Sequence, residues 1–420
     1  MEQWKEYTLG EIAKFSQGIQ VDIENQSLSP KEGYVRFIRI VDFTKGNEPI
    51  RYIAKPKEQY LTRKDDIVMI RYGSQTAGLV VKSFSGAIAN NMFKISLDED
   101  IINKKFAYYV LSQKSIFSSI RNSQSSSTMP AITFEIASKI HLYLPNLDEQ
   151  KRIADFLSSL DDKIELNRQI NDNLEQQAQA LFKSWFVDFE PFKDGEFVDS
   201  ELGMIPKGWR VGTLSELSSK MISGDWGKET LIDNYTRQVF CIRGADIPDI
   251  KVGNRGKMPI RFILEKNYNN KALTPDDLVV EISGGSPTQS TGRICQISSE
   301  LISYYDNSII CTNFCKAISP IKGYSAFVYY LWNMLYDQGV MFLYENGTTG
   351  IKNLDISGLL DKHLVIIPTQ EIATAYSNTI KKLTDKILLN SIESANLSQL
   401  RDTLLPRLMS GELKINEINC

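Results

Sequence analysis

The chain of 420 residues contains an internal repeat, and this repeat constrains its fold more than any other feature of the sequence. The repeat is clearest in the second part of each half, where residues align without gaps at an offset of 223 positions, from Pro145 to Pro368. The same offset joins Asp162-Lys163-Ile164 to Asp385-Lys386-Ile387, Leu166-Asn167 to Leu389-Asn390, and Asn173-Leu174 to Asn396-Leu397. A run of this length predicts that one architecture occurs twice.

Weaker matches precede this run in each half, in the same order and with an offset that drifts, as it does when loops differ in length. They pair Trp4 with Trp209, Arg39 and Asp42 with Arg243 and Asp246, Asp65-Asp66 with Asp276-Asp277, Gly73-Ser74 with Gly285-Ser286, Asn91 with Asn313, and Tyr108-Tyr109 with Tyr329-Tyr330. Each half is therefore predicted to hold a body, at 1–145 and 209–368, followed by one long helix, at 146–187 and 369–413. Glycine, proline and acidic residues at 188–208 mark a connector between the halves.

The two bodies are predicted to be mixed α/β domains, because short β-branched and aromatic runs alternate with turn residues and a few helical stretches. Strands are expected at 35–41, 67–71 and 79–81 in the first body, and at 240–242, 278–282 and 294–297 in the second. Helices are expected at 106–111 and 326–335.

The two long helices carry a seam with alternating steps of four and three residues, which is the heptad of a coiled coil. The predicted seam consists of Ile153, Leu157, Leu160, Ile164, Asn167, Leu174 and Leu181 in the first helix, and of Ile380, Leu383, Ile387, Asn390, Leu397 and Leu404 in the second. A helix of about 36 residues is ~54 Å long, which is more than a compact domain needs. We therefore expect the two seams to pair, with buried Asn167 and Asn390 fixing the register. The alternative is that each helix packs separately on its own body.

Composition excludes several classes of protein. With 42% hydrophobic and 24% charged residues, the chain is typical of globular proteins and not of fibres or disordered tails. No stretch approaches the ~18 apolar residues of a membrane span, and the first residues lack the apolar run of a secretory signal, so a cytoplasmic protein without a membrane partner is expected. Five cysteines, all in the second half, are too few for a disulfide framework and are expected to be free thiols.

The net charge of −3 gives no sign of nucleic-acid binding by itself. The charge is unevenly distributed, however: residues 1–145 contain 19 basic and 15 acidic residues, whereas 146–205 contain 6 and 14. The second body, within 206–368, is close to neutral, with 17 basic and 16 acidic residues. The acidic surplus thus lies in the first helix and the connector, and a DNA contact by the bodies is compatible with the total.

No catalytic constellation stands out. The chain lacks the Asn/Asp-Pro-Pro-aromatic motif of adenine methyltransferases and the phosphate loop of ATPases. Asp276 and Glu281 have the spacing of many nuclease carboxylates, but Ser283 stands where a lysine is needed. Cys311 and Cys315 have the spacing of half a metal site, yet the first half has no counterpart, and packing as small hydrophobes is the simpler interpretation. We expect neither a catalytic site nor a metal site.

The duplicated body and helix, together with the connector sequence, resemble the DNA-specificity subunit of type I restriction-modification systems. The connector carries the resemblance in Trp185-Phe186-Val187-Asp188-Phe189-Glu190-Pro191-Phe192 and in Gly203-Met204-Ile205-Pro206-Lys207-Gly208-Trp209. The helix openings, from Leu144-Pro145 and Ile367-Pro368, look like the two conserved helices of that family, although the Glu-Gln pair of the first opening is inverted and shifted to Gln370-Glu371 in the second.

The resemblance implies a non-catalytic subunit with two target-recognition domains, each reading a short word of double-stranded DNA, and two antiparallel helices that separate them. It also implies two methylation subunits that hold S-adenosylmethionine, and two translocase-nuclease subunits that use ATP and Mg²⁺ for restriction. The recognised site would consist of two half-sites separated by unspecified bases. The alternatives are a stand-alone DNA nuclease and a scaffold that does not contact DNA.

Base-reading residues are expected where the two copies diverge, because two halves that read different words need different side chains. A glycine-rich loop meets this condition, and its candidates are Arg71, Ser74, Gln75 and Thr76 in the first body and Ser286, Thr288, Gln289 and Ser290 in the second. A second divergent polar pair of segments lies at 123–128 and 346–350. The phosphate candidates are Arg36, Arg39, Arg63 and Lys64 in the first body and Arg243, Arg255, Lys257 and Arg261 in the second. A plain polar hairpin and solvated surface are the alternatives for these residues.

Overall fold

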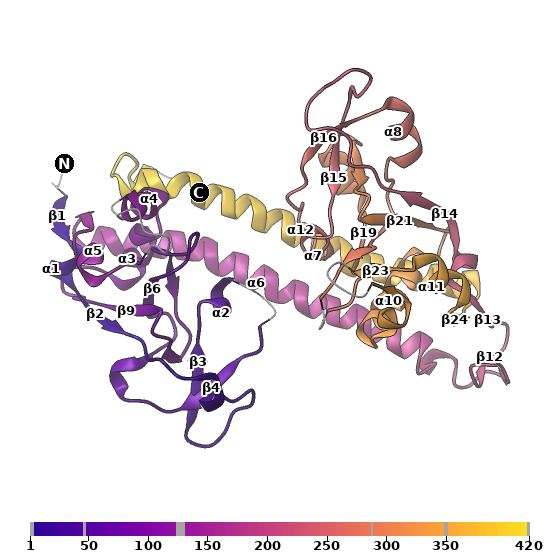
Figure 1. Cartoon of the computed structure of the whole chain (residues 1–420), viewed down its shortest axis with the longest axis horizontal. Coiled ribbons are helices and arrows are strands. Elements are labelled where there is room, and N and C mark those ends of the chain that lie inside the picture. Colours follow the sequence, from indigo (N-terminus) through magenta and orange to yellow (C-terminus); the bar gives the residue numbers. More distant parts are fainter. Residues whose placement is uncertain (1–3, 45–47, 123–130, 287–288, 348–351, 418–420) are drawn as a thin grey trace. The chain divides into compact units, whose positions relative to one another are not determined.

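The fold comes from a computed structural model that describes residues 4–44, 48–122, 131–286, 289–347 and 352–417 (Figure 1). The chain forms two compact units, one of residues 1–163 with 397–420 and one of residues 164–396. Each unit therefore contains one body together with parts of both long helices. The whole predicted polar segment 123–128, residues 348–350 of its counterpart and Thr288 of the predicted glycine loop lie outside the described residues.

The body of the first unit contains two four-stranded sheets. One has the order β2 (Ala13–Gln17), β9 (Met92–Leu97), β6 (Ile67–Ile70), β7 (Val80–Lys82), and all its neighbours are antiparallel. The other has the order β4 (Arg51–Ala54), β3 (Tyr34–Ile38), β8 (Gly86–Ile88), β5 (Leu61–Thr62), with β3 and β8 parallel. Strands β1 (Lys5–Thr8) and β10 (His141–Leu144) pair separately. The helices are α1 (Leu9–Ile12), α2 (Val41–Thr44), α3 (Lys104–Leu111), α4 (Lys114–Asn122) and α5 (Phe134–Ser138).

The body of the second unit repeats this topology. Its four-stranded sheet has the order β14 (Ser218–Ser223), β21 (Cys315–Pro320), β17 (Leu278–Glu281), β19 (Ile294–Gln296), and its three-stranded sheet has the order β16 (Ile260–Ile263), β15 (Arg237–Ile242), β20 (Ile309–Cys311). Strands β15 and β20 are parallel, as β3 and β8 are in the first body, and β13 (Arg210–Thr213) pairs with β24 (Leu364–Ile367) as β1 pairs with β10. A further sheet contains β18 (Ser283–Gly284), β23 (Lys352–Leu354) and β22 (Glu345–Asn346). The connector forms β11 (Phe197–Val198) with β12 (Ile205–Pro206), and the helices are α7 (Ile247–Lys251), α8 (Glu265–Lys271), α9 (Ser299–Tyr304), α10 (Ser325–Asp337) and α11 (Ile356–Lys362).

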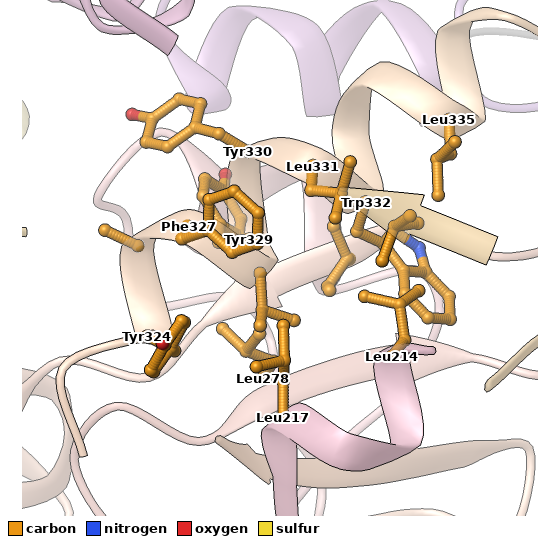
Figure 2. Packing of buried hydrophobic residues seen from close by; sticks show 14 of the residues in the cluster. Leu214, Leu217, Leu278, Tyr324, Phe327, Tyr329, Tyr330, Leu331, Trp332 and Leu335 are labelled. Carbon is orange, nitrogen blue, oxygen red and sulfur yellow. The ribbon is translucent and has the colours of Figure 1, made fainter. Parts of the chain in front are cut away.

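Aromatic packing around α10 builds the core of the second body (Figure 2). Its buried side chains include Phe327, Tyr330 and Trp332, and the Trp332 indole donates a 2.7 Å hydrogen bond to the carbonyl of Gly292. The long α6 (Leu147–Phe186) contributes Ala178, Phe182 and Phe186 to the same cluster. In the first unit, the start of α6 and the end of α12 (Gln370–Met409) join a separate core.

The mixed α/β class, the repeat and the two long helices are confirmed, and two local expectations need correction. The strand expected at 35–41 ends at Ile38, because the Asp42 carboxylate accepts a 2.6 Å hydrogen bond from the Arg39 backbone N–H and starts α2. The predicted match of Asn91 with Asn313 is one residue off. Met92 N donates to the carbonyl of Ala89, and Cys315 N donates to that of Thr312, which places Asn90 opposite Asn313.

The helices α6 and α12 contact each other in both units and run antiparallel. In the second unit, Asn167 lies beside Asn390, and the hydroxyl of Tyr376 donates to the carbonyl of Ala178. In the first unit, Arg401 donates a 2.6 Å hydrogen bond to Asp161. The alternative of two separate helices is therefore wrong, although both helices also pack on the bodies. In the part of the chain that is described, no helix is both long and apolar enough to cross a membrane.

Candidate nucleic-acid interface

The predicted glycine loop of the first body joins β6 to β7 at one end of the four-stranded sheet. Gly73 has a φ of +116°, and a Cβ there would lie 2.1 Å from the Thr76 hydroxyl, so the tight turn requires glycine. The Thr76 hydroxyl donates a 2.8 Å hydrogen bond to the carbonyl of Tyr72, and Arg71 Nε donates to the carbonyl of Ile132. Thr76 and Arg71 thus hold the loop in shape, whereas Ser74 and Gln75 are exposed at its tip.

The equivalent loop of the second body joins β17 to β19 and is tied to the β22–β23 hairpin. Ser283 of β18 pairs with Asn353, and Glu345 accepts hydrogen bonds from the backbone and hydroxyl of Thr291. Ser286 and Gln289 face each other across a short bridge, and Gln289 is exposed. Ser290 is only 4% exposed, so we leave it out of the interface proposed below.

Glu281, at the end of β17, is committed to a structural ion pair. Its two carboxylate oxygens accept hydrogen bonds of 2.7 and 2.8 Å from Arg293. The hydrogen bond to Glu281 raises the pKa of Arg293, and burial lowers it by a smaller amount. The pKa of Arg293 therefore lies above its ordinary value. The carboxylate that a nuclease would need as a metal ligand is thus paired with a guanidinium.

Two phosphate candidates, Arg39 and Arg243, occupy equivalent positions and hold the bodies together. Each guanidinium donates to a carboxylate three residues later, Asp42 or Asp246, and each backbone N–H donates to the same carboxylate. Burial alone would raise the pKa of Asp246, but hydrogen bonds from Arg243 and from the Lys257 backbone hold it below its ordinary value. Because this arrangement is kept in both copies, we interpret it as scaffold.

The remaining cationic candidates divide into stacked and exposed side chains. Three guanidinium groups stack on aromatic rings at 3.6–3.8 Å, which are the pairs Arg36–Phe84, Arg255–Tyr304 and Arg261–Trp226. Arg261 also pairs with Glu229 and is 8% exposed, so we do not assign it a direct phosphate contact. Arg63, Lys64 and Lys257 are exposed.

The predicted seam residues are all buried or half-buried, and the polar layer in the second unit is larger than the sequence indicated. Asn390 donates a 2.9 Å hydrogen bond to Asn171, and Asn171 donates to the carbonyl of Ile387 and to Ser391. Asn167 donates to Glu393 at 2.8 Å. Such a layer stabilises one axial register over its neighbours, because any slip would leave these amides unpaired.

The four cysteines that the structure describes are buried in the second body. Cys241, Cys295, Cys311 and Cys315 are free thiols, and burial raises the pKa of Cys241 and Cys315 to about 12. Among the described residues, no group of histidine, cysteine, aspartate or glutamate side chains is arranged to hold a metal ion. The thiols therefore pack as small apolar groups.

Comparison with known proteins shows which proteins this chain resembles. The family model described as the type I restriction modification DNA specificity domain matches residues 1–176. The type I restriction enzyme HindI specificity subunit of Haemophilus influenzae is 26% identical over 98% of this chain and its own full length. The MjaIX specificity subunit of Methanocaldococcus jannaschii is 29% identical over 81% of this chain and 76% of its own. The chain is therefore similar to the specificity subunits of type I restriction-modification systems, and the family model covers its residues 1–176.

A solved specificity subunit has the same fold. The S subunit from M. genitalium superposes with a TM-score of 0.52 and 20% sequence identity, covering 96% of both chains. Members of the specificity-subunit family are the DNA-recognition components of these complexes and perform no catalytic step themselves. In this chain, the sequence predicted the long helices and the position of the glycine loop. It missed a polar groove at the same end of the sheet in the first body, which forms through a close backbone approach at Gly18 that nothing in the sequence indicates.

Proposed function

We propose that the chain reads a bipartite DNA target, with one half-site for each body. The observation that carries this proposal is that the two bodies share one scaffold but differ in the loops at one end of the four-stranded sheet. Equivalent arginine–aspartate pairs, at Arg39–Asp42 and Arg243–Asp246, support a common frame. Different loops on a common frame are what two readers of different words need.

The proposed base contacts lie at that sheet end in each body. Ser74 and Gln75 would contact base edges in the first body, and Ser286 and Gln289 would do so in the second, with Thr288 as a further candidate. Exposed Arg63, Lys64 and Lys257 would contact phosphates, since cations that bind the DNA backbone position the duplex without reading its sequence.

We further propose that α6 and α12 set the spacing between the half-sites and dock the other subunits. Two continuous helices of 40 residues, each ~60 Å long, support this role, as does the polar layer that fixes their register. Two methylation subunits would bring S-adenosylmethionine, and two restriction subunits would bring ATP and Mg²⁺. Because the target would be cellular DNA, we place the complex in the cytoplasm.

An exchange of the second body tests the proposal. The full chain and a chimera in which an unrelated specificity subunit supplies residues 209–368 would each be expressed with the methylation subunits, and the methylated adenines would be mapped. We expect one half-site to change and the other to persist. A chimera that leaves both half-sites unchanged would refute the assignment of one word to each body.

The purified chain alone provides the control for the nuclease alternative. We expect no DNA cleavage when Mg²⁺ or Mn²⁺ is added without the partner subunits. Metal-dependent cleavage that persists after gel filtration would contradict a non-catalytic role.

A further inference from the structure

A polar groove opens in the first body where β2 ends and β9 begins. It has a volume of about 520 Å³, and its walls include the amide side chains of Gln17, Gln20, Gln59 and Asn90. We call it the amide groove. Tyr60 and Phe15 complete the wall, so flat rings lie beside side chains that each carry one hydrogen-bond donor group and one acceptor.

The groove is built on a close backbone approach at Gly18. A Cβ on Gly18 would lie 2.2 Å from the carbonyl oxygen of Ala89, so only glycine fits there. The adjoining Ile19 N–H donates a 2.8 Å hydrogen bond to the carbonyl of Ile88, and Asn90 N–H donates to the carbonyl of Ile19. Rigid backbone thus positions two of the amides, and Asn90 Nδ2 donates to Gln20 Oε1 at 3.0 Å.

The second body has the same backbone crossing but different side chains. A Cβ on Gly224 would lie 1.9 Å from the carbonyl oxygen of Thr312, and the next N–H, of Asp225, donates to the carbonyl of Cys311 as Ile19 does to Ile88. There, however, the Asp225 carboxylate binds Asn267 and Lys271, and Trp226 lies under Arg261. The frame is kept and the chemistry changes, which is the pattern expected of residues that read different words.

The amide groove and the glycine loop lie at the same end of one sheet. Gln17 at the end of β2 is opposite Phe93 of β9, which is opposite Met69 near the end of β6, where the glycine loop begins. Two strand spacings separate β2 from β6 by ~10 Å. The major groove of DNA is ~12 Å wide and base pairs are ~3.4 Å apart, so both features fit one stretch of major groove, about three base-pair steps apart.

We propose that the amide groove reads A·T base pairs in the half-site of the first body. This inference rests on the proposed function, that the chain reads DNA. A glutamine or asparagine amide pairs with adenine through two hydrogen bonds, donating to N7 and accepting from the N6 amino group. Gln17 and Gln59 are exposed and make this contact, while the Asn90–Gln20 pair fixes the shape of the groove between them.

The test uses the full chain expressed with its methylation subunits on a library of randomised sites. The half-site of the first body is the one that persists when the second body is exchanged. Gln17→Leu and Gln59→Leu keep the side-chain size and remove the paired hydrogen bonds. Gln338→Leu, at an exposed glutamine in the second body, is the control. We expect each groove variant to lose roughly 5- to 150-fold of the preference for A·T at one position of the first half-site, and the second half-site to stay unchanged.

A second variant asks for a change of preference instead of a loss. In Gln59→Glu, the carboxylate accepts from the cytosine N4 amino group and cannot donate to adenine N7, so the preferred base should move toward cytosine. An unaltered first half-site in all three groove variants, equal weakening at every site, or a wild-type half-site without an A·T pair would overturn the groove assignment alone. A wild-type complex that methylates no specific sequence would overturn the proposed function as well.

Discussion

The contact between Asp161 of α6 and Arg401 of α12 offers a quantitative test of the helix pairing. Asp161 accepts a 2.6 Å hydrogen bond from Arg401 and another of 2.6 Å from the hydroxyl of Tyr109 on α3. The side chains of Asp161 and Arg401 are 23% and 29% exposed, so water screens the pair only partly. Burial and the nearby carboxylate raise the pKa of Tyr109, so its hydroxyl stays a donor at neutral pH.

Replacement of Asp161 by alanine removes both hydrogen bonds. A hydrogen bond to a charged group contributes about 1.5–3 kcal/mol, and partial exposure places each bond near the lower end. Arg401 keeps its 2.8 Å contact with Asp402 and is not left unpaired. We therefore expect Asp161→Ala to lower the free energy of unfolding of the first unit by about 2–4 kcal/mol. Asp161→Asn, which keeps the acceptor oxygen, should lower it by about 1–2 kcal/mol.

Hydrogen exchange measured by mass spectrometry reports each unit separately, which matters because a chain with two units need not unfold in one step. Protection should fall in 147–163 and 397–409 and stay unchanged in 370–383. The neighbouring exposed Asp162→Ala is the control and should lie within about 0.5 kcal/mol of wild type. If Asp161→Ala and Asp162→Ala lowered the exchange protection of 147–163 and 397–409 equally, the pairing of the helices through the Asp161–Arg401 contact would be refuted.

Three further predictions concern the bodies. The hydrogen bonds that lower the pKa of Asp246 stabilise the fold at pH values above the unfolded pKa of ~3.9, and this stabilisation is lost as pH falls through the lower pKa of the folded state. The Tm of wild type should therefore fall more steeply on acidification than the Tm of Asp246→Asn, while the control Asp337→Asn should follow wild type. Parallel curves of Tm against pH for all three proteins would contradict the prediction. Gly18→Ala and Gly224→Ala each force a Cβ against a carbonyl oxygen and should lower the free energy of unfolding by about 1–3 kcal/mol or more. Gly18→Ala should lower hydrogen-exchange protection only in the first unit, and Gly224→Ala only in the second. Equal loss of protection in both units would contradict the prediction of local collisions. A Cys420→Ser variant retains the four buried thiols, two of which have a pKa near 12. These thiols should not react with a disulfide reagent at about pH 8 until denaturant is added. Stoichiometric labelling of the native chain would contradict this prediction, because it would show that the thiols are accessible.

Much of the architecture could be predicted from the internal repeat and from the heptad pattern, because both can be recognised within short stretches of sequence. The helix seam follows from a heptad, and the structure places residues such as Leu157 and Ile387 inside the core or the helix pair. The repeat also aligns Asp65-Asp66 with Asp276-Asp277, and both pairs lie in equivalent turns before β6 and β17. In both copies the first aspartate has a positive φ and the second accepts a backbone hydrogen bond.

The site was less predictable because it depends on contacts between distant segments. Nothing near Gly18 in the sequence indicates that it crosses Ala89, and the two amides Gln20 and Asn90 meet only through that crossing. The roles of the arginines were also hidden. Arg36 is predicted to contact phosphates, and the sequence does not show that its guanidinium lies 3.8 Å from the ring of Phe84, which is a neighbour only in the folded body.

The most direct test of whether each body reads its own half-site is a map of the adenines that the chain and its methylation subunits modify in genomic DNA. We expect one motif made of two different short words separated by a fixed number of unspecified bases. A continuous motif, or methylation without a sequence preference, would contradict a subunit in which two bodies on one scaffold each read their own word.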